Sequence, residues 1–352
     1  MSQVHPEVQY DEYHQPSGLF AKALKTNNKK ILSLLLLSFT AVCCETLQHF
    51  KILGSLFVLW YFFYATSYLV ICVYLIFKRK SFKEFINYFA REIATYMSND
   101  TSIRKFITKY RTLTTLGYPF IFTLYSINAT FDVIKMDQQS QSNYQIAIKI
   151  FSHILRSIIY LNRYAIIQFI IECCLHVQVC FKMVEDQIES LKMSDSSLNF
   201  EEMQQIRQLY DVAIEKSRKL DSLLFWIFPV YYFTCIGSFQ LNLVIIIYGF
   251  NHLYLIFMVR EVFSLILLTF HIANINRLAN AAFNQVYSRS YKVESIEMQN
   301  EMRFFFTRIR RGDVGLNILK IVLITPAFVT SFGTLLLTIA LAIPTIFKKN
   351  LT

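Results

Sequence analysis

NILKIVLITPAFVTSFGTLLLTIALAIPTIF occupies residues 317–347 and is the last long apolar run of the chain. At about 1.5 Å of rise per helical residue, this run exceeds the length that a bilayer core of about 30 Å requires. We therefore expect either that part of the helix projects beyond the membrane or that the helix breaks. Pro326 and Gly333 predict a kink, or a close approach of a neighbouring helix, within the run.

A stripe of hydroxyl groups follows one face of this helix. Thr330, Thr334 and Thr338 recur at every fourth position, and Leu341 and Thr345 continue the same face. The remaining surface is made of Leu, Ile, Val, Phe and Ala side chains. Two interpretations are open, because such a stripe can line a water-filled path or can mediate helix contacts while bonding to its own backbone.

The composition is typical of an integral membrane protein built from helices. Of the 352 residues, 54% are hydrophobic and 17% are charged. Only 8 glycines and 6 prolines are present, which favours long helices over a barrel of short strands. We predict an all-α, polytopic membrane protein with seven transmembrane helices, at approximately 31–49, 55–77, 113–133, 147–181, 222–250, 252–273 and 314–347.

The distribution of basic residues predicts the orientation. With a cytosolic N-terminus, the inside segments carry 26 of the 35 Lys and Arg residues and the outside segments carry 5. This positive-inside bias predicts a cytosolic tail over 1–30 and an extracellular tail over 348–352. The formal net charge of +11 then faces the anionic inner leaflet of the bilayer, so no nucleic acid partner is required. We expect a multi-pass protein of the plasma membrane.

The segments expected in the cytosol are helical rather than unstructured. Asn199 and Glu202 resemble a capping box that opens an amphipathic helix through Leu220, and residues 294–311 show a second apolar face. We therefore predict that 182–221 and 274–313 form a packed cytosolic anchor region. The alternative is that these helices lie on the inner leaflet.

No set of residues with catalytic spacing occurs in the chain. A glycine-rich phosphate loop, a His-Glu metal motif and a nucleophile elbow are all missing from the sequence. The seven histidines are scattered singly, and the seven cysteines lie in or beside apolar runs without zinc-ligand spacing. We expect a protein that is not an enzyme and that needs neither a cofactor nor a metal ion.

Charged residues inside the predicted spans mark a candidate site, because each is costly in lipid and should face protein or water. Arg156 and Arg163 lie on one face of the fourth span, and Arg260 and Glu261 lie near the middle of the sixth. They can form structural ion pairs or an ion or ligand site, and both interpretations are open. Possible acidic partners are Asp132, Glu172 and Glu261.

The outer halves of the spans carry more aromatic residues than an interfacial belt needs. Polar side chains lie at a similar depth, and an aromatic pocket with a few polar groups suits a small organic ligand. The candidate pocket residues are Trp60, Tyr64, Tyr125, Asn128, Arg156, Tyr160 and Gln240.

At its C-terminal end the sequence resembles the insect gustatory receptor family of the insect chemoreceptor superfamily. Those receptors carry Thr-Tyr, five hydrophobic residues and then Gln-Phe in the last span. The aligned stretch here is Ser331-Phe332, then 333–337, then Thr338-Ile339. The inverted seven-helix topology, the long fourth helix and the helical cytoplasmic segments extend the resemblance to most of the chain.

The resemblance implies a ligand-gated, non-selective channel for monovalent cations. Such a channel is a homo- or heterotetramer in which the last helix of each subunit lines the pore. By position, Ile339 corresponds to the hydrophobic gate and Thr338 to the polar residue beside it. The resemblance also implies that a small tastant binds in the outer half of the bundle. The alternatives are a gustatory-receptor-like subunit or scaffold without channel activity, and a membrane transporter.

Overall fold

The computed structural model describes residues 39, 55–87, 101–138, 143–193, 200–248, 252–290 and 295–349. Within these ranges the chain is helical apart from turns, two short connections and one two-stranded hairpin. The elements are α3 (Ser55–Phe77), α5 (Thr101–Thr115), α6 (Gly117–Gln138), α7 (Asn143–Met193), α8 (Phe200–Leu224), α9 (Ile227–Tyr248), α10 (His252–Ser290), α11 (Ile296–Arg310), β1 (Asn317–Ile318), β2 (Val322–Leu323) and α12 (Pro326–Lys349).

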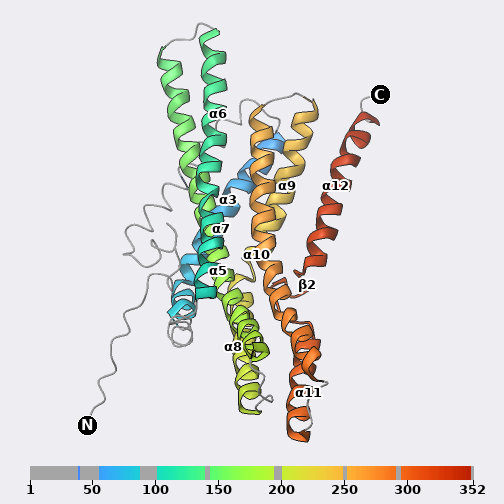
Figure 1. The fold of residues 1–352 in the computed structure, drawn as a ribbon. Coiled ribbons are helices and arrows are strands. Elements are labelled where there is room, and N and C mark those ends of the chain that lie inside the picture. The colour runs from blue at the N-terminus through green and yellow to red at the C-terminus, as the bar shows by residue number, and fades with distance from the viewer. Residues whose placement is uncertain are drawn as a thin grey trace, which may run out of the picture.

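Two long helices connect the upper and lower parts of the molecule. The helix α7 has 51 residues and α10 has 39, and the two pack on each other more extensively than any other pair. In Figure 1, α6, α9 and α12 accompany them in the upper part, whereas α8 and α11 lie beside their lower ends. Between them, Gln178 of α7 donates a hydrogen bond of 2.6 Å to the carbonyl of His271 on α10 and accepts one of 3.0 Å from Asn274.

The lower part is a packed helical assembly in which each helix buries an amphipathic face. Met298, Met302 and Phe305 of α11 are buried, as the sequence pattern predicts for 294–311. Tyr210 of α8 packs edge-on against Phe305 and donates a hydrogen bond of 3.2 Å to the carbonyl of Ala279 on α10. Burial raises the pKa of Tyr210, so this phenol stays a neutral donor.

The outer faces of the upper helices are apolar. Three helical segments are long and apolar enough to cross a membrane, namely Arg163–Ser190, Ile227–Ile247 and Tyr254–Phe283. A fourth is present if Phe62–Phe77 and Arg79–Asn87, which meet at a bend of 62°, count as one span. Large side chains on these faces, as expected for contact with lipid, include Leu59, Phe62, Phe122, Phe151, Ile154, Phe233 and Ile266.

The chain is therefore a membrane protein, but the described residues give three or four spans by length and composition rather than the seven expected. The predicted first span, 31–49, lies outside the described residues except for Phe39. In α12 the apolar segment is the shorter Pro326–Ile339. The number of seven spans and the orientation with a cytosolic N-terminus and an extracellular C-terminus remain predictions.

The predicted span 113–133 contains a helix joint. The chain turns at Leu116, between the end of α5 and the start of α6 at Gly117. The Tyr164 hydroxyl donates a hydrogen bond of 2.5 Å to the Thr114 carbonyl near the end of α5. A Cβ atom at Gly117 would lie 2.0 Å from that hydroxyl oxygen, so only glycine fits here while Tyr164 keeps this position.

The prediction of one helix over 314–347 is wrong for residues 314–325. This segment forms the β1–β2 hairpin, in which Asn317 pairs with Leu323 and Ile318 with Val322. The turn residues Leu319 and Lys320 have φ of 53° and 58°, a left-handed conformation that costs non-glycine residues about 1–2 kcal/mol each. Lys320, which the sequence placed inside a span, therefore lies in a hairpin turn.

The helix α12 begins at Pro326 for a local reason. Proline has no backbone N–H group and disfavours helical geometry in the preceding residue, so it fits the first turn of a helix but not its interior. The Thr325 hydroxyl accepts a hydrogen bond of 3.1 Å from the backbone N–H of Phe328 and caps the start of the helix. The break expected in this long run thus lies before Pro326.

The hairpin is attached to α8 and α10 by polar contacts. Asp221 of α8 accepts a bond of 2.6 Å from the backbone N–H of Asn317 and one of 3.3 Å from its side chain. Burial raises the pKa of Asp221, although these two donors oppose the shift. On the other side, the Asn276 side chain of α10 donates a bond of 2.8 Å to the carbonyl of Val314. The start of α12 therefore follows the positions of α8 and α10.

Candidate ligand site and the last helix

A buried ion pair lies in the upper part of the helix bundle. Arg260 and Glu261, adjacent on α10, form an ion pair although both side chains are almost fully buried. A charge at this depth is strongly disfavoured unless other groups solvate it. The side chains that surround the pair therefore decide what this part of the bundle can bind.

Three tyrosines from three other helices surround the pair. Tyr64 of α3 donates to Glu261 and accepts a bond of 2.6 Å from Arg260, and Tyr125 of α6 accepts a second bond from Arg260. Tyr160 of α7 stacks on Tyr125 with ring centroids 4.5 Å apart. The Arg260 guanidinium carbon lies 4.0 Å from the Tyr160 ring centroid, a cation–π contact.

A second buried guanidinium belongs to the same group. The Arg163 guanidinium carbon lies 4.5 Å from the ring centroid of Tyr64 and 4.7 Å from that of Tyr68. The Cys235 thiol of α9 donates a hydrogen bond of 3.4 Å to Glu261. We call this group the aromatic–charge cluster, and its members are Tyr64, Tyr68, Tyr125, Tyr160, Arg163, Cys235, Phe257, Arg260 and Glu261.

The cluster has the chemical groups of a small-molecule site. It offers aromatic faces, phenol groups that donate and accept hydrogen bonds, two cations and one carboxylate, all with little surrounding water. Its members come from α3, α6, α7, α9 and α10. A ligand that competes for any of these contacts would therefore act on five helices at once.

Of the predicted pocket residues, Tyr64, Tyr125 and Tyr160 come together in the cluster. Trp60, Asn128 and Arg156 lie on α3, α6 and α7, but their side chains are outside what the structure describes. Gln240 is half-buried on α9, and the described contacts of the cluster do not include it. The prediction of Tyr64, Tyr125 and Tyr160 rested on their depth in the spans. The sequence did not indicate which charged residues they would contact.

The residues at the centre of the cluster were not in the predicted pocket. The sequence shows charged residues inside the predicted spans at Arg260, Glu261 and Arg163. Their position in the spans is the signal that indicates a place in the buried cluster. Glu172, considered a partner for the buried arginines, instead pairs with Arg111 of α5, whose Nη2 lies 3.1 Å from a carboxylate oxygen. Arg111 lies before the predicted third span, so the pattern of intramembrane charges does not include it.

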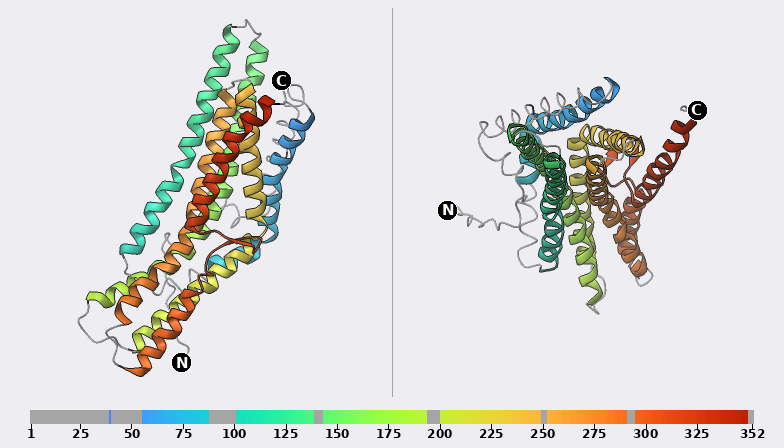
Figure 2. Two further views of the ribbon diagram at one scale, coloured as in Figure 1. Left: turned by 90° about the vertical axis from the view of Figure 1, so that its right-hand side faces the viewer. Right: turned by 90° about the horizontal axis from the view of Figure 1, so that it is seen from above.

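The helix α12 has two distinct faces. One face packs on the bundle through Phe328, Phe332 and Leu336. Tyr232 of α9 contacts both phenylalanines edge-on, with ring centroids 6.3 and 5.7 Å away. The exposed residues on the rest of this helix include Thr330, Thr334, Leu335, Leu337, Thr338 and Leu341. Figure 2 shows that α12 has helices of the same chain on one side only.

Each threonine of the stripe bonds to its own helix. The hydroxyls of Thr330, Thr334 and Thr338 donate to the carbonyls of Ala327, Thr330 and Thr334 at 2.8, 3.0 and 2.8 Å. Each hydroxyl oxygen keeps a lone pair for water or for another helix. The stripe is thus polar enough for either interpretation given by the sequence.

Ile339 and Gly333 of α12 are also relevant to whether the threonine stripe lines a water-filled path or mediates helix contacts. Ile339, next to Thr338, is half-buried. A Cβ atom at Gly333 would have no atom within 4 Å in the described part of the chain. The close approach that the sequence predicted at Gly333 is therefore not present among the described residues of this chain, and α12 continues through Gly333 without interruption.

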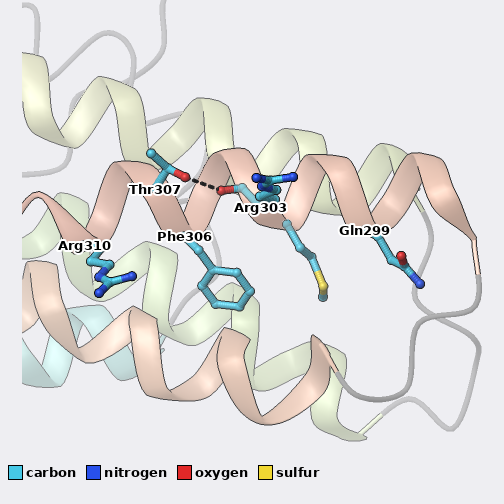
Figure 3. A pocket seen from close by; sticks show the side chains of 6 residues that line it. Gln299, Arg303, Phe306, Thr307 and Arg310 are labelled. Carbon is cyan, nitrogen blue, oxygen red and sulfur yellow. Dashed lines mark hydrogen bonds between the residues drawn. The ribbon is translucent and has the colours of Figure 1, made fainter.

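A separate pocket of about 470 Å³ lies in the lower part of the molecule, along α11. Figure 3 shows the side chains of this helix that line it. They are Gln299, Met302, Arg303, Phe306, Thr307 and Arg310. The pocket is cationic and open, and it shares no residue with the aromatic–charge cluster.

Sequence comparison alone does not place this chain in a family. No protein-family model matches it. No curated protein matches it either.

Comparison with solved structures identifies the fold. The chain is similar to the insect olfactory receptor OR5 from Machilis hrabei in complex with eugenol, with 12% identity and a TM-score of 0.63. The match covers 93% of this chain and 90% of the receptor. OR5 from Machilis hrabei in a second structure gives 11% identity and a TM-score of 0.61, over 90% and 88% of the two chains. This chain therefore has the fold of an insect olfactory receptor.

Proposed function

We propose that this protein is a ligand-gated, non-selective cation channel of the insect chemoreceptor superfamily. The observation that carries the proposal is the two-faced α12, which packs on its own bundle through aromatic residues and exposes a threonine stripe. A pore helix needs both properties, since one face must be held by its subunit and the other must face water and neighbouring subunits. The likeness of fold to an olfactory receptor supports the same assignment.

The assembly proposed here is a homo- or heterotetramer in the plasma membrane, with a cytosolic N-terminus and an extracellular C-terminus. Four copies of α12 would surround a central path for monovalent cations. Thr330, Thr334 and Thr338 would support water in this path, and a ring of Ile339 side chains would close it by expelling water when narrowed. No acidic residue lies between Pro326 and Lys349, so selectivity among monovalent cations should be weak.

The proposed ligand is a small organic molecule held at the aromatic–charge cluster. The olfactory receptor with this fold was solved with eugenol, a small aromatic phenol. Tyr64, Tyr125 and Tyr160 would provide ring faces and hydroxyls in this chain. Trp60, Asn128, Arg156 and Gln240 are proposed to extend the pocket toward the outer surface.

We further propose that this receptor is of the gustatory type. It rests on the stretch from Ser331 to Ile339, whose positions correspond to the gustatory receptor motif in the last span. The ligand would accordingly be a tastant.

The proposal is tested by recording currents from cells that express this chain alone, with a panel of small organic compounds. Tyr125→Phe removes the hydroxyl that contacts Arg260 and that the proposed ligand would bind. It should raise the half-maximal ligand concentration about fivefold, as expected when the bound ligand loses one hydrogen bond. The matched control is Tyr287→Phe, which removes the hydroxyl of an exposed tyrosine in the lower part of α10. Equal responses of the two variants would exclude the cluster as the ligand site.

A second candidate function is a subunit or scaffold that does not conduct. The observation that favours it is the bonding of all three stripe hydroxyls to their own helix, which is also typical of helix contacts in membranes. A scaffold would give no current alone but would change the currents of a co-expressed conducting receptor. Currents from the chain expressed alone would exclude this alternative.

A further inference from the structure

Three separate elements meet at one level of the molecule, where the apolar upper part gives way to the polar lower part. They are the end of α3, the turn between α8 and α9, and the tip of the β1–β2 hairpin. The Tyr74 hydroxyl of α3 donates a hydrogen bond of 3.1 Å to the carbonyl of Leu223 near the end of α8. Lys320 at the hairpin tip lies 5.8 Å from the Phe225 ring centroid in the α8–α9 turn. In Figure 2 the hairpin reaches this junction.

Each of the three elements exposes a large apolar side chain here. The exposed fractions are 83% for Phe77, 59% for Trp226 and 79% for Ile321. Side chains this exposed would be costly in water, and their positions at the ends of apolar helices predict contact with lipid instead. Tryptophan in particular prefers the headgroup level of a bilayer.

Basic side chains accompany these apolar ones. Lys78 follows Phe77 directly and Lys80 lies two residues further on, while Lys320 precedes Ile321. All three lysines are exposed. The helix axis bends by 62° between Phe77 and Arg79, as expected for a chain that leaves the membrane at this point.

Acidic residues are fewer than basic ones in the segments that form this junction. The stretches 77–81, 225–226 and 318–322 contain no Asp or Glu. Asp221 of α8, which accepts the two Asn317 donors, also lies close enough to Lys320 for their opposite charges to attract each other. The junction therefore combines an exposed apolar surface with a net positive charge, since Lys78, Arg79, Lys80 and Lys320 outnumber Asp221 and Glu84.

We propose that this junction is a binding site for the headgroup of an anionic phospholipid in the leaflet on the α8 and α11 side. Phe77, Trp226 and Ile321 contact the acyl chains and the glycerol level, while Lys78, Lys80 and Lys320 hold the phosphate and carboxylate groups. Since the hairpin leads directly into α12, the lipid also holds the lower end of this helix in place. The inference depends on the membrane location of the chain and not on channel activity.

The chain contains two tryptophans, so Trp60→Phe leaves Trp226 as the single tryptophan, which is excited selectively at wavelengths where tyrosine does not absorb. This variant of the full chain is placed in nanodiscs that contain brominated phosphatidylcholine or, at the same mole fraction, brominated phosphatidylserine. A surface lysine favours anionic lipid by about fivefold, so quenching of Trp226 by brominated phosphatidylserine should exceed that by brominated phosphatidylcholine at least about twofold. Equal quenching by the two lipids would overturn the proposal.

The charge dependence is tested with Lys78→Gln, Lys80→Gln and Lys320→Gln together, which should abolish the preference for phosphatidylserine. The control triple Lys105→Gln, Lys109→Gln and Arg303→Gln removes the same charge from exposed positions on α5 and from the α11 pocket, and it should keep the preference. An equal loss in both triples would show diffuse attraction rather than a site and would overturn the proposal. Loss of the preference on adding inorganic phosphate would assign the lysines to a soluble anion and would also overturn it.

Discussion

The guanidinium of Arg260 lies over the ring of Tyr160, with 4.0 Å between its central carbon and the ring centroid. This contact joins α10 to α7 in the upper part of the bundle, and Glu261 neutralises the same guanidinium. A cation between an aromatic ring and a carboxylate is well solvated without water. Removal of either charge should therefore have a large effect.

We predict that Arg260→Gln destabilises the protein by about 3–5 kcal/mol, because it leaves the Glu261 carboxylate buried without its cation. The double variant Arg260→Gln with Glu261→Gln should cost less than the single one, since no buried charge remains. Thermal unfolding of the purified protein in detergent measures both. The control is Arg310→Gln at an exposed position of α11, which should change stability by less than about 0.5 kcal/mol. A single variant as stable as this control would contradict the buried-pair interpretation.

Two glycines of the chain should respond oppositely to alanine. At Gly117 the added methyl group would lie 2.0 Å from the Tyr164 hydroxyl, so Gly117→Ala should cost about 1–3 kcal/mol. At Gly333 the methyl group meets nothing, and Gly333→Ala inside α12 should stabilise the helix by about 0.5–1 kcal/mol. Thermal unfolding compares the two directly.

A double variant tests whether the destabilisation by Gly117→Ala is caused by a steric clash with Tyr164. Combining Gly117→Ala with Tyr164→Leu removes the clashing ring. The double variant should therefore lose less free energy of unfolding than the sum of the losses in the two single variants. Strictly additive losses would mean that Tyr164 and residue 117 do not collide.

The proposed pore predicts a specific pattern of currents. Ile339→Ala should raise the basal current, because smaller side chains no longer expel water at the constriction. Thr338→Gln should alter ion permeation, since a longer amide reaches further into the path. Recordings from cells that express each variant, with and without ligand, measure these effects.

Cysteine accessibility distinguishes a pore from a helix contact. Single cysteines at positions 330, 334 and 338 should react with an aqueous thiol reagent when ligand is present. The control is Leu336→Cys, on the face of α12 that packs against the core, which should stay protected. Protection at all four positions would favour the scaffold.

The orientation predicted from the basic residues is tested with epitope tags. A tag after Thr352 should be stained on intact cells, and a tag before Met1 should be stained only after permeabilisation. The reason is the excess of Lys and Arg in the segments assigned to the cytosol. The opposite staining would overturn the inverted topology and the family resemblance that depends on it.

Sequence periodicity predicted the helices well where a regular apolar face existed. The faces of Met203, Ile206 and Leu209 in α8 and of Met298, Met302 and Phe305 in α11 are buried as expected. Such patterns are visible in sequence because each buried residue repeats at helical spacing.

The hairpin before α12 could not be predicted in the same way. The residues from Ile318 to Ile324 are as apolar as those of the helix that follows, and Leu319 and Lys320 are unusual in a turn that needs positive φ. The hairpin depends on tertiary contacts such as Asp221 with Asn317, which a local pattern does not contain. The same holds for Arg111 with Glu172, 61 positions apart in the chain. The sequence indicated that Arg163, Arg260 and Glu261 are buried, wrongly placed Lys320 inside a span, and did not show which partners the buried charges would meet.

The unbroken path of α7 from the upper bundle to the lower part limits how such a sequence can change in length during evolution. One residue inserted near the middle of its 51 residues would turn everything below by about 100° and shift it by about 1.5 Å. Tyr160 and Arg163 would then no longer face the cluster while the lower half keeps its contacts with α8. Related chains are therefore expected to gain and lose residues in the connections between helices, and to keep the spacing between Tyr160 and the lower end of α7 constant.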